Sequence, residues 1–279
     1  MAFSLAATVA GSAVRDESHP SAIVVRLQCA KAECVVVHDR KSRKLRSLMP
    51  LYPGDEVIFR GDMGEIEIGL ADKSTIKLGS GNHEVEIPDI SQPDGFLWTF
   101  WSEVASGFRR EKQNEETASA RAETIGPALL SLCPAAPAGG HYKLAKLDAS
   151  VTLIVRGGTG PFHADIADSS GNRLSGDDSV KSRVIVLRGT ALMAGPANLR
   201  VTDMSRKSEP LDMQLDIAGR PPQASELPDM NGASPGARDA VRYGWLAFEG
   251  DGEWALEAVS EAHDAGAGDA FEDLCGLTE

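Results

Sequence analysis

Short strand-like runs separated by turn residues are the feature that most limits how this chain can fold. They recur about every 8–12 residues between Ser21 and Ile90. Glu65–Ile68 and Thr75–Leu78 alternate polar and apolar residues as half-buried strands do, and Ala71–Ser74 turns the chain between them. This spacing predicts a small β domain over residues 21–92.

A second series of strand-like runs lies further along the chain. Ser150–Val155 is rich in β-branched residues, and Leu211–Ile217 alternates cleanly. Such runs predict an immunoglobulin-like β-sandwich over residues 141–220, although the Cys–Trp–Cys pattern of antibody domains is absent. The glycine-rich stretch Gly157–Gly160 precedes a strand-like run rather than a helix, so it predicts a hairpin turn and not a phosphate loop.

Two helical regions accompany the β domains. An aromatic-rich stretch, Phe96–Trp101, opens a predicted helix in residues 93–140, which end in a Pro/Ala/Gly linker. Residues 221–279 predict a linker and an acidic helical tail, with helices over Ala237–Phe248 and Trp254–His263. The predicted fold class is therefore mainly β, with a helical linker between two β domains and a C-terminal helical hairpin.

The charge is distributed unevenly. The formal net charge is −13, which argues against a general nucleic-acid binder. Residues 221–279 hold thirteen acidic and two basic residues, whereas residues 1–60 hold nine basic and six acidic ones. The basic residues of the first part cluster at Arg40, Lys41, Arg43, Lys44 and Arg46. This cluster is either a solvated hairpin tip or a surface that steers an acidic partner.

The N-terminus and the cysteines bear on the compartment. Residues 1–20 predict a signal-peptide-like or flexible start, because residues 1–14 are apolar, uncharged and rich in small side chains, but lack a basic region. Cys29 and Cys34 either pair across a hairpin turn or remain free thiols, and Cys133 and Cys275 show no local signal. We expect the periplasm or cell envelope, with the cytoplasm as the alternative.

No motif in the sequence predicts an enzyme. It contains no HExxH and no CxxC motif. Asp168, Ser170 and Asn172 alternate oxygen side chains like the first half of a calcium loop, but Ser179 stands where such a loop has Glu. A turn explains this segment better. We therefore predict no catalytic residue, no metal site and no cofactor.

Two stretches resemble known bacterial proteins. Leu51–Leu78, with Tyr-Pro-Gly-Asp followed by paired strand-like runs, resembles the FecR-type β domain, although Lys73 replaces the glycine common in its last turn. Gly157–Phe162, Ala194–Asp203 and the paired tryptophans of the tail resemble uncharacterised bacterial proteins with an immunoglobulin-like domain and a short helical tail. The resemblance implies an envelope or signalling accessory protein that acts through protein contacts, and it implies no catalytic residues.

The predicted function is thus a non-enzymatic interaction protein whose partner is another bacterial protein. The alternative is a module that binds an envelope glycan or a metal ion. No apolar run reaches the roughly 18–20 residues of a membrane span. The predicted contact residues are aromatic or basic: Trp98, Trp101, Arg40, Lys41, Arg43, Lys44, Arg46, Trp245 and Trp254.

Overall fold

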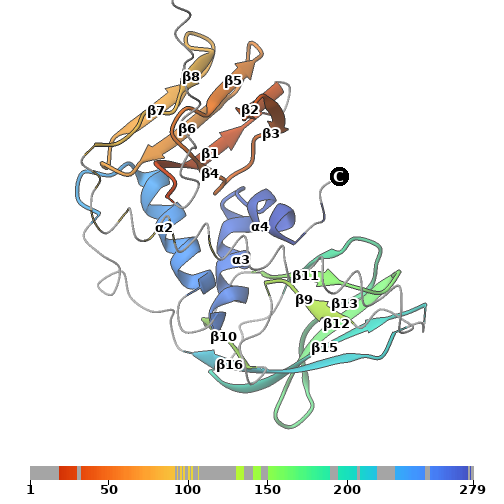
Figure 1. Cartoon of the computed structure of the whole chain (residues 1–279). Helices are drawn as coiled ribbons and strands as arrows, with labels where there is room; N and C mark the ends of the chain where they lie inside the picture. The colour runs from red at the N-terminus through yellow and green to blue at the C-terminus, as the bar shows by residue number, and fades with distance from the viewer. Residues whose placement is uncertain are drawn as a thin grey trace, which may run out of the picture.

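The fold is mainly β, as predicted, with helices between two β-sandwiches (Figure 1). The computed structural model describes a set of continuous segments and several single positions. These are residues 19–29, 33–91, 130–134, 141–145, 150–188, 194–205, 208–218, 230–248 and 252–275, and positions 93, 95, 97, 100, 102, 106 and 277. Residues 1–18, which include the signal-like start, lie outside them.

Two four-stranded sheets form the N-terminal module. Their orders are β4-β1-β6-β7 and β3-β2-β5-β8. The strands are β1 (Ala22–Gln28), β2 (Glu33–His38), β3 (Lys41–Lys44), β4 (Pro50–Leu51), β5 (Glu56–Arg60), β6 (Glu65–Leu70), β7 (Thr75–Leu78) and β8 (Glu84–Glu86). Alternate residues of these strands, such as Val36, Phe59 and Ile66, meet in one buried core. The period-two pattern in the sequence therefore corresponds to the inward face of this module.

The C-terminal sandwich packs a five-stranded sheet, β10-β16-β15-β12-β13, on a three-stranded sheet, β14-β11-β9. The strands are β9 (Ser131–Leu132), β10 (His141–Ala145), β11 (Val151–Arg156), β12 (Phe162–Asp168), β13 (Arg173–Val180), β14 (Val184–Leu187), β15 (Gly195–Asp203) and β16 (Leu211–Ala218). Because β9 pairs with β11, this sandwich also includes residues that precede position 141.

The predicted hairpin at Gly157–Gly160 is wrong. Strand β11 pairs with β14 and β9, whereas β12 pairs with β13 and β15, so the turn carries the chain from one sheet to the other. Buried Asp203 accepts a hydrogen bond from the Thr159 N–H at 2.9 Å, and Arg183 donates to the carbonyls of Gly157 and Gly158. A glycine-rich turn has the same local signal whether it closes a hairpin or carries the chain to another sheet, because the turn residues do not encode which strands pair afterwards.

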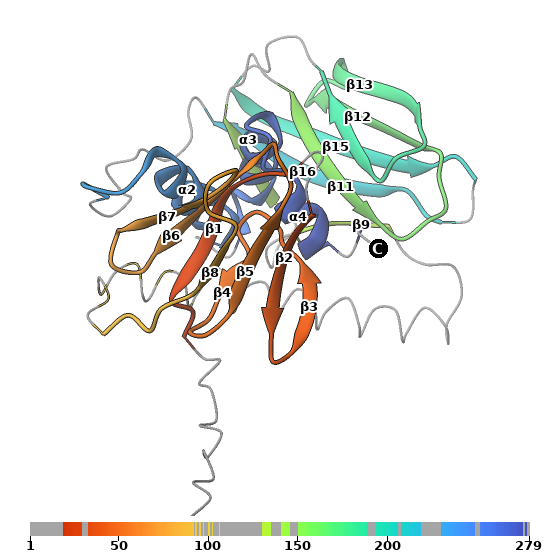
Figure 2. The same ribbon diagram turned by 90° about the horizontal axis from the view of Figure 1, so that it is seen from above.

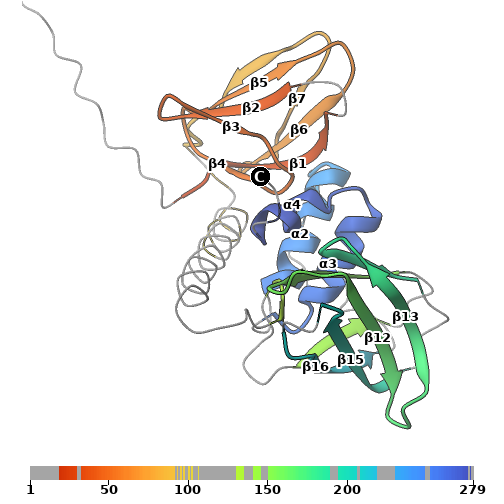
Figure 3. The ribbon, with the colours of Figure 1, turned by 90° about the vertical axis from the view of Figure 1, so that its right-hand side faces the viewer.

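Three helices of the described chain form a layer between the sandwiches: α2 (Pro235–Phe248), α3 (Ala255–Asp264) and α4 (Asp269–Leu274) (Figures 1 and 3). The start of α2 lies against the outer face of β1 and β6, where Gly69 permits a close approach. A Cβ added at Gly69 would lie 3.0 Å from Val25 and 3.5 Å from Ala237. One buried cluster joins residues of the N-terminal module, the helices and the C-terminal sandwich. The described helices of the acidic tail therefore pack against both sandwiches.

Helix α3 covers backbone edges of β10 and β11 in the C-terminal sandwich. The side chain of Glu257 accepts the Ala145 N–H of β10 at 2.9 Å, and Ser260 accepts the Thr152 N–H of β11 at 2.9 Å. These bonds satisfy backbone donors that bond to no strand among the described residues. Glu257 is fully buried, and its Oε1 has no hydrogen-bond partner among the described residues. Burial raises the pKa of Glu257 to about 7.

Both cysteine pairs form disulfides. Cys29 and Cys34 join β1 to the start of β2, while Cys133 and Cys275 join the C-terminal sandwich to the end of α4 across 142 residues of sequence. The guanidinium of Arg156 donates to the carbonyls of Leu274 and Cys275, which satisfies acceptors at the end of α4. Two disulfides indicate an oxidising, extracytoplasmic location. Among the described helices, none has the length and hydropathy of a membrane span.

Candidate functional site

The structure separates the predicted contact residues into three groups. Trp98 and Trp101 lie outside the described residues. Their neighbours Leu97 and Phe100 are described, and both are buried in the cluster that joins the two sandwiches. At least part of this aromatic stretch therefore contributes to the packing between domains.

The tail tryptophans belong to the helical layer. Trp245 on α2 and Trp254 just before α3 are partly buried and pack against the same central cluster. Part of each indole is therefore used in packing within the chain.

The basic residues, in contrast, gather on an exposed hairpin. We call β2, β3 and the turn between them the basic hairpin. Arg40, Lys41, Arg43 and Lys44 are all exposed, and Arg46 just beyond β3 is half-buried. In Figure 2 the turn of this hairpin points away from the C-terminal sandwich. The structure thus brings four predicted cations together on one accessible element.

A tight turn places these cations. Asp39 and Arg40 have φ values of 48° and 65°, as expected for a two-residue hairpin turn that matches the twist of the strands. Asn-Gly or Asp-Gly is the favoured pair in such turns, because glycine adopts positive φ without strain. Arg40 therefore occupies a position where glycine fits the backbone better.

A buried carboxylate anchors the turn end of the basic hairpin. Asp55, 2% exposed, lies 2.5 Å from Nδ1 of His38 at the end of β2. The same carboxylate accepts the Tyr52 N–H at 2.8 Å, and the rings of Tyr52 and His38 lie 5.8 Å apart between centroids. The Tyr-Pro-Gly-Asp turn before β5 is thereby connected to the hairpin. This connection orders the hairpin in advance, which reduces the entropy lost when it binds a partner.

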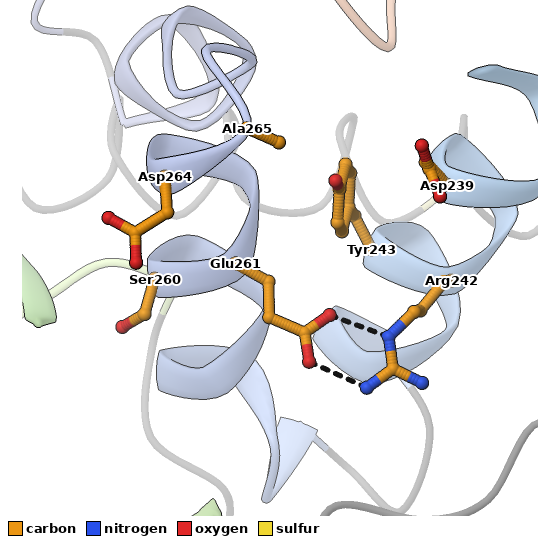
Figure 4. Close-up of a pocket in the computed structure, with 7 residues that line it drawn as sticks. All are labelled: Asp239, Arg242, Tyr243, Ser260, Glu261, Asp264 and Ala265. Carbon is orange, nitrogen blue, oxygen red and sulfur yellow. Dashed lines mark hydrogen bonds and ion pairs between the residues drawn. The ribbon is translucent and has the colours of Figure 1, made fainter. Parts of the chain in front are cut away.

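A cleft of about 390 Å³ lies between α2 and α3 (Figure 4). Arg242 and Glu261 cross it with two hydrogen bonds of 2.6 Å, and Asp264 accepts a bond from Ser150 at 2.9 Å. The hydrogen bond to Glu261 raises the pKa of Arg242. The lining residues come from both helices: Asp239, Arg242, Tyr243, Ser260, Glu261, Asp264 and Ala265.

Burial shifts the pKa of two other groups that line this cleft. It raises the pKa of Tyr243 to about 12 and also raises the pKa of Asp239. Tyr243 therefore stays a neutral phenol at physiological pH. The ion pair between Arg242 and Glu261 connects α2 to α3 across the cleft, so these residues hold the two helices together.

The segment that resembles half a calcium loop is a hairpin turn between β12 and β13. Asp168 accepts the N–H groups of Ser170 and Asn172 and the side-chain amide of Asn172, at 2.8 to 2.9 Å. The hydrogen bonds to Asn172 lower the pKa of Asp168. Within the described part of the chain, no three His, Cys, Asp or Glu side chains are placed to hold a metal ion.

Neither the Asp55–His38 contact nor the cleft between α2 and α3 was predicted from the sequence. The Tyr52–Asp55 turn was visible in the sequence, but its contact with His38 spans 17 residues. The cleft has no motif, because its residues are spaced as in any amphipathic helix.

Comparison with known proteins yields little. No family model matches the chain, and no curated protein matches it. The structure of CopC from Methylosinus trichosporium OB3b matches 32% of this chain and 92% of its own, at 19% identity and a TM-score of 0.24. The BSP domain of a biofilm associated protein matches 72% of this chain and 28% of its own, at 12% identity and a TM-score of 0.25. Scores this low support no inference about function.

Proposed function

We propose that this protein is a non-enzymatic binding protein of the periplasm or cell envelope, which contacts a partner protein through the basic hairpin. The observation that carries the proposal is the exposure of Arg40, Lys41, Arg43 and Lys44 together on one element, whereas the described tryptophans are used in packing. The FecR-type resemblance of this module, which implies action through protein contacts, supports the same conclusion.

The rest of the molecule suits a rigid support. The central cluster and the Cys133–Cys275 disulfide join the two sandwiches through the helical layer. Such a body presents the hairpin in one orientation, so binding requires little reordering. The clustered positive charge attracts an acidic surface and accelerates encounter, and this effect falls with ionic strength.

The test is recovery of the partner from the native host. Tagged wild-type protein is compared with a variant that carries Lys41→Glu, Arg43→Glu and Lys44→Glu. A matched control carries Lys181→Glu, Arg188→Glu and Arg200→Glu, which reverses three exposed cations of the C-terminal sandwich. Both variants are checked for an unchanged melting temperature.

We expect a stoichiometric partner to copurify with the wild type and the control but not with the hairpin variant. Equal recovery by both variants would show that the hairpin is not the contact surface. A wild-type chain that copurifies with no partner would overturn the proposal.

A further inference from the structure

The outer edge of β3 offers backbone hydrogen bonds as well as charge. β3 is the end strand of its sheet, and its other side pairs with β2. Within the described part of the chain, no strand lies beyond it. An end strand of this kind is a template for a further strand.

The register identifies which groups face outward. His38 pairs with Lys41 across the turn, and the Leu45 N–H donates to the Cys34 carbonyl at 2.8 Å. In an antiparallel pair, bonded and non-bonded residues alternate, so Lys41, Arg43 and Leu45 bond to β2. The N–H and C=O groups of Ser42 and Lys44 therefore point away from β2.

The side chains around this edge are cationic on both faces. Arg43 lies opposite Val36, which is in the module core, and Lys44 lies opposite Val35 on the other face of the sheet. An added strand would have cations beside it on either face. Lysines on an end strand discourage pairing with neutral or basic strands, and they favour an acidic one.

We propose that the partner binds by adding an extended, acidic segment as a new strand along the outer edge of β3. This inference rests on the proposed function and names how the basic hairpin recognises its partner. Backbone bonds to Ser42 and Lys44 supply the register, and carboxylates beside Lys41, Arg43 and Lys44 supply selectivity. The positive charge around the edge of β3 favours an acidic segment over a neutral or basic one.

The experiment titrates the purified full chain with a capped peptide of about eight residues that alternates Glu and Val. A peptide of the same composition interrupted by proline serves as the control ligand. Ser42→Pro removes one outward N–H and leaves the bonds to β2 intact, because proline is tolerated where the N–H of an end strand faces solvent. Ser42→Ala keeps that N–H and is the matched control variant.

We expect Ser42→Pro to weaken binding about tenfold, while Ser42→Ala binds like the wild type. The amides of Ser42 and Lys44 should gain protection from hydrogen exchange on binding, whereas those of Lys41 and Arg43 should be protected already. The proline-interrupted peptide should bind more weakly than the alternating one.

Several results would overturn strand addition. If Ser42→Pro binds like the wild type while Lys41→Glu with Arg43→Glu abolishes binding, the hairpin acts through charge alone and the proposed function survives. If the wild type binds neither peptide, this occupant is wrong, and partner recovery still tests the proposed function. If the chain instead forms a dimer that Ser42→Pro dissociates, the edge receives a second copy.

Discussion

Glu257 makes the stability of this protein depend on pH in an unusual direction. Its carboxyl group is fully buried where α3 meets β10, and its pKa rises from 4.5 to about 7 because burial penalises the charged form. Unfolded chains release this proton near pH 4.5, whereas the folded protein retains it up to about pH 7. The stability contributed by this group is therefore fully present below pH 4.5 and is lost as the pH rises to about 7.

The size of the effect follows from the difference between the two pKa values. At about 1.4 kcal/mol per pH unit, it amounts to roughly 3 kcal/mol for a group with no exposed surface. Nearby charges also influence Glu257: the negative charge of Glu261 raises its pKa, whereas Arg242 lowers it. The Ala145 N–H also lowers it, but burial outweighs these attractions.

Glu257→Gln removes the titration and keeps an oxygen that can accept the Ala145 N–H. Urea unfolding at pH 5 and pH 8, with the disulfides intact, measures the free energy of unfolding. We expect the stability difference between the two pH values to change by about 2 to 3 kcal/mol relative to the wild type, with the variant gaining at pH 8. Glu209→Gln removes an exposed carboxylate and should leave the pH dependence almost unchanged. If Glu257→Gln showed the wild-type pH dependence, the buried carboxyl group of Glu257 would not be its cause.

Three further predictions concern contacts that connect separate elements of the fold. Replacing Cys133 and Cys275 by Ser opens a loop of 142 residues, and we expect a loss of up to about 5 kcal/mol, measured by urea unfolding. Gly69→Leu should cost about 1–3 kcal/mol and lower the melting temperature, because the added side chain meets Val25 and α2. Burial raises the pKa of Asp203, but hydrogen bonds from Ser205 and Thr159 lower it by more. The pKa of Asp203 is therefore below its ordinary value. Asp203→Asn should therefore be less stable than the wild type at neutral pH. Below the pKa of Asp203 the two proteins should differ little in their free energy of unfolding, which urea unfolding across a pH series would measure.

Local patterns were sufficient to predict much of the fold. Alternation at Glu65–Ile68 and Leu211–Ile217 predicted strands because side chains of a strand point to opposite faces in turn, whatever lies across the sheet. The basic cluster was also predictable, since Arg40 to Lys44 are adjacent in the sequence and charged side chains of a short turn-linked strand remain in solvent. The possible bond between Cys29 and Cys34 was visible for the same reason, because only a short loop separates the two residues.

Only the tertiary structure decided the features that join distant residues. No local signal related Cys133 to Cys275, or Glu257 to the Ala145 N–H, because 142 and 112 residues separate these pairs. The turn at Gly157 looked like a hairpin, because a turn specifies how the chain bends but not which sheet the next strand joins. The apolar faces of the helices in the acidic tail are buried between two sandwiches that each supply part of the same core. Burial is a property of the assembled fold, and it alone separated the exposed cations of the basic hairpin from the packed tryptophans of the tail.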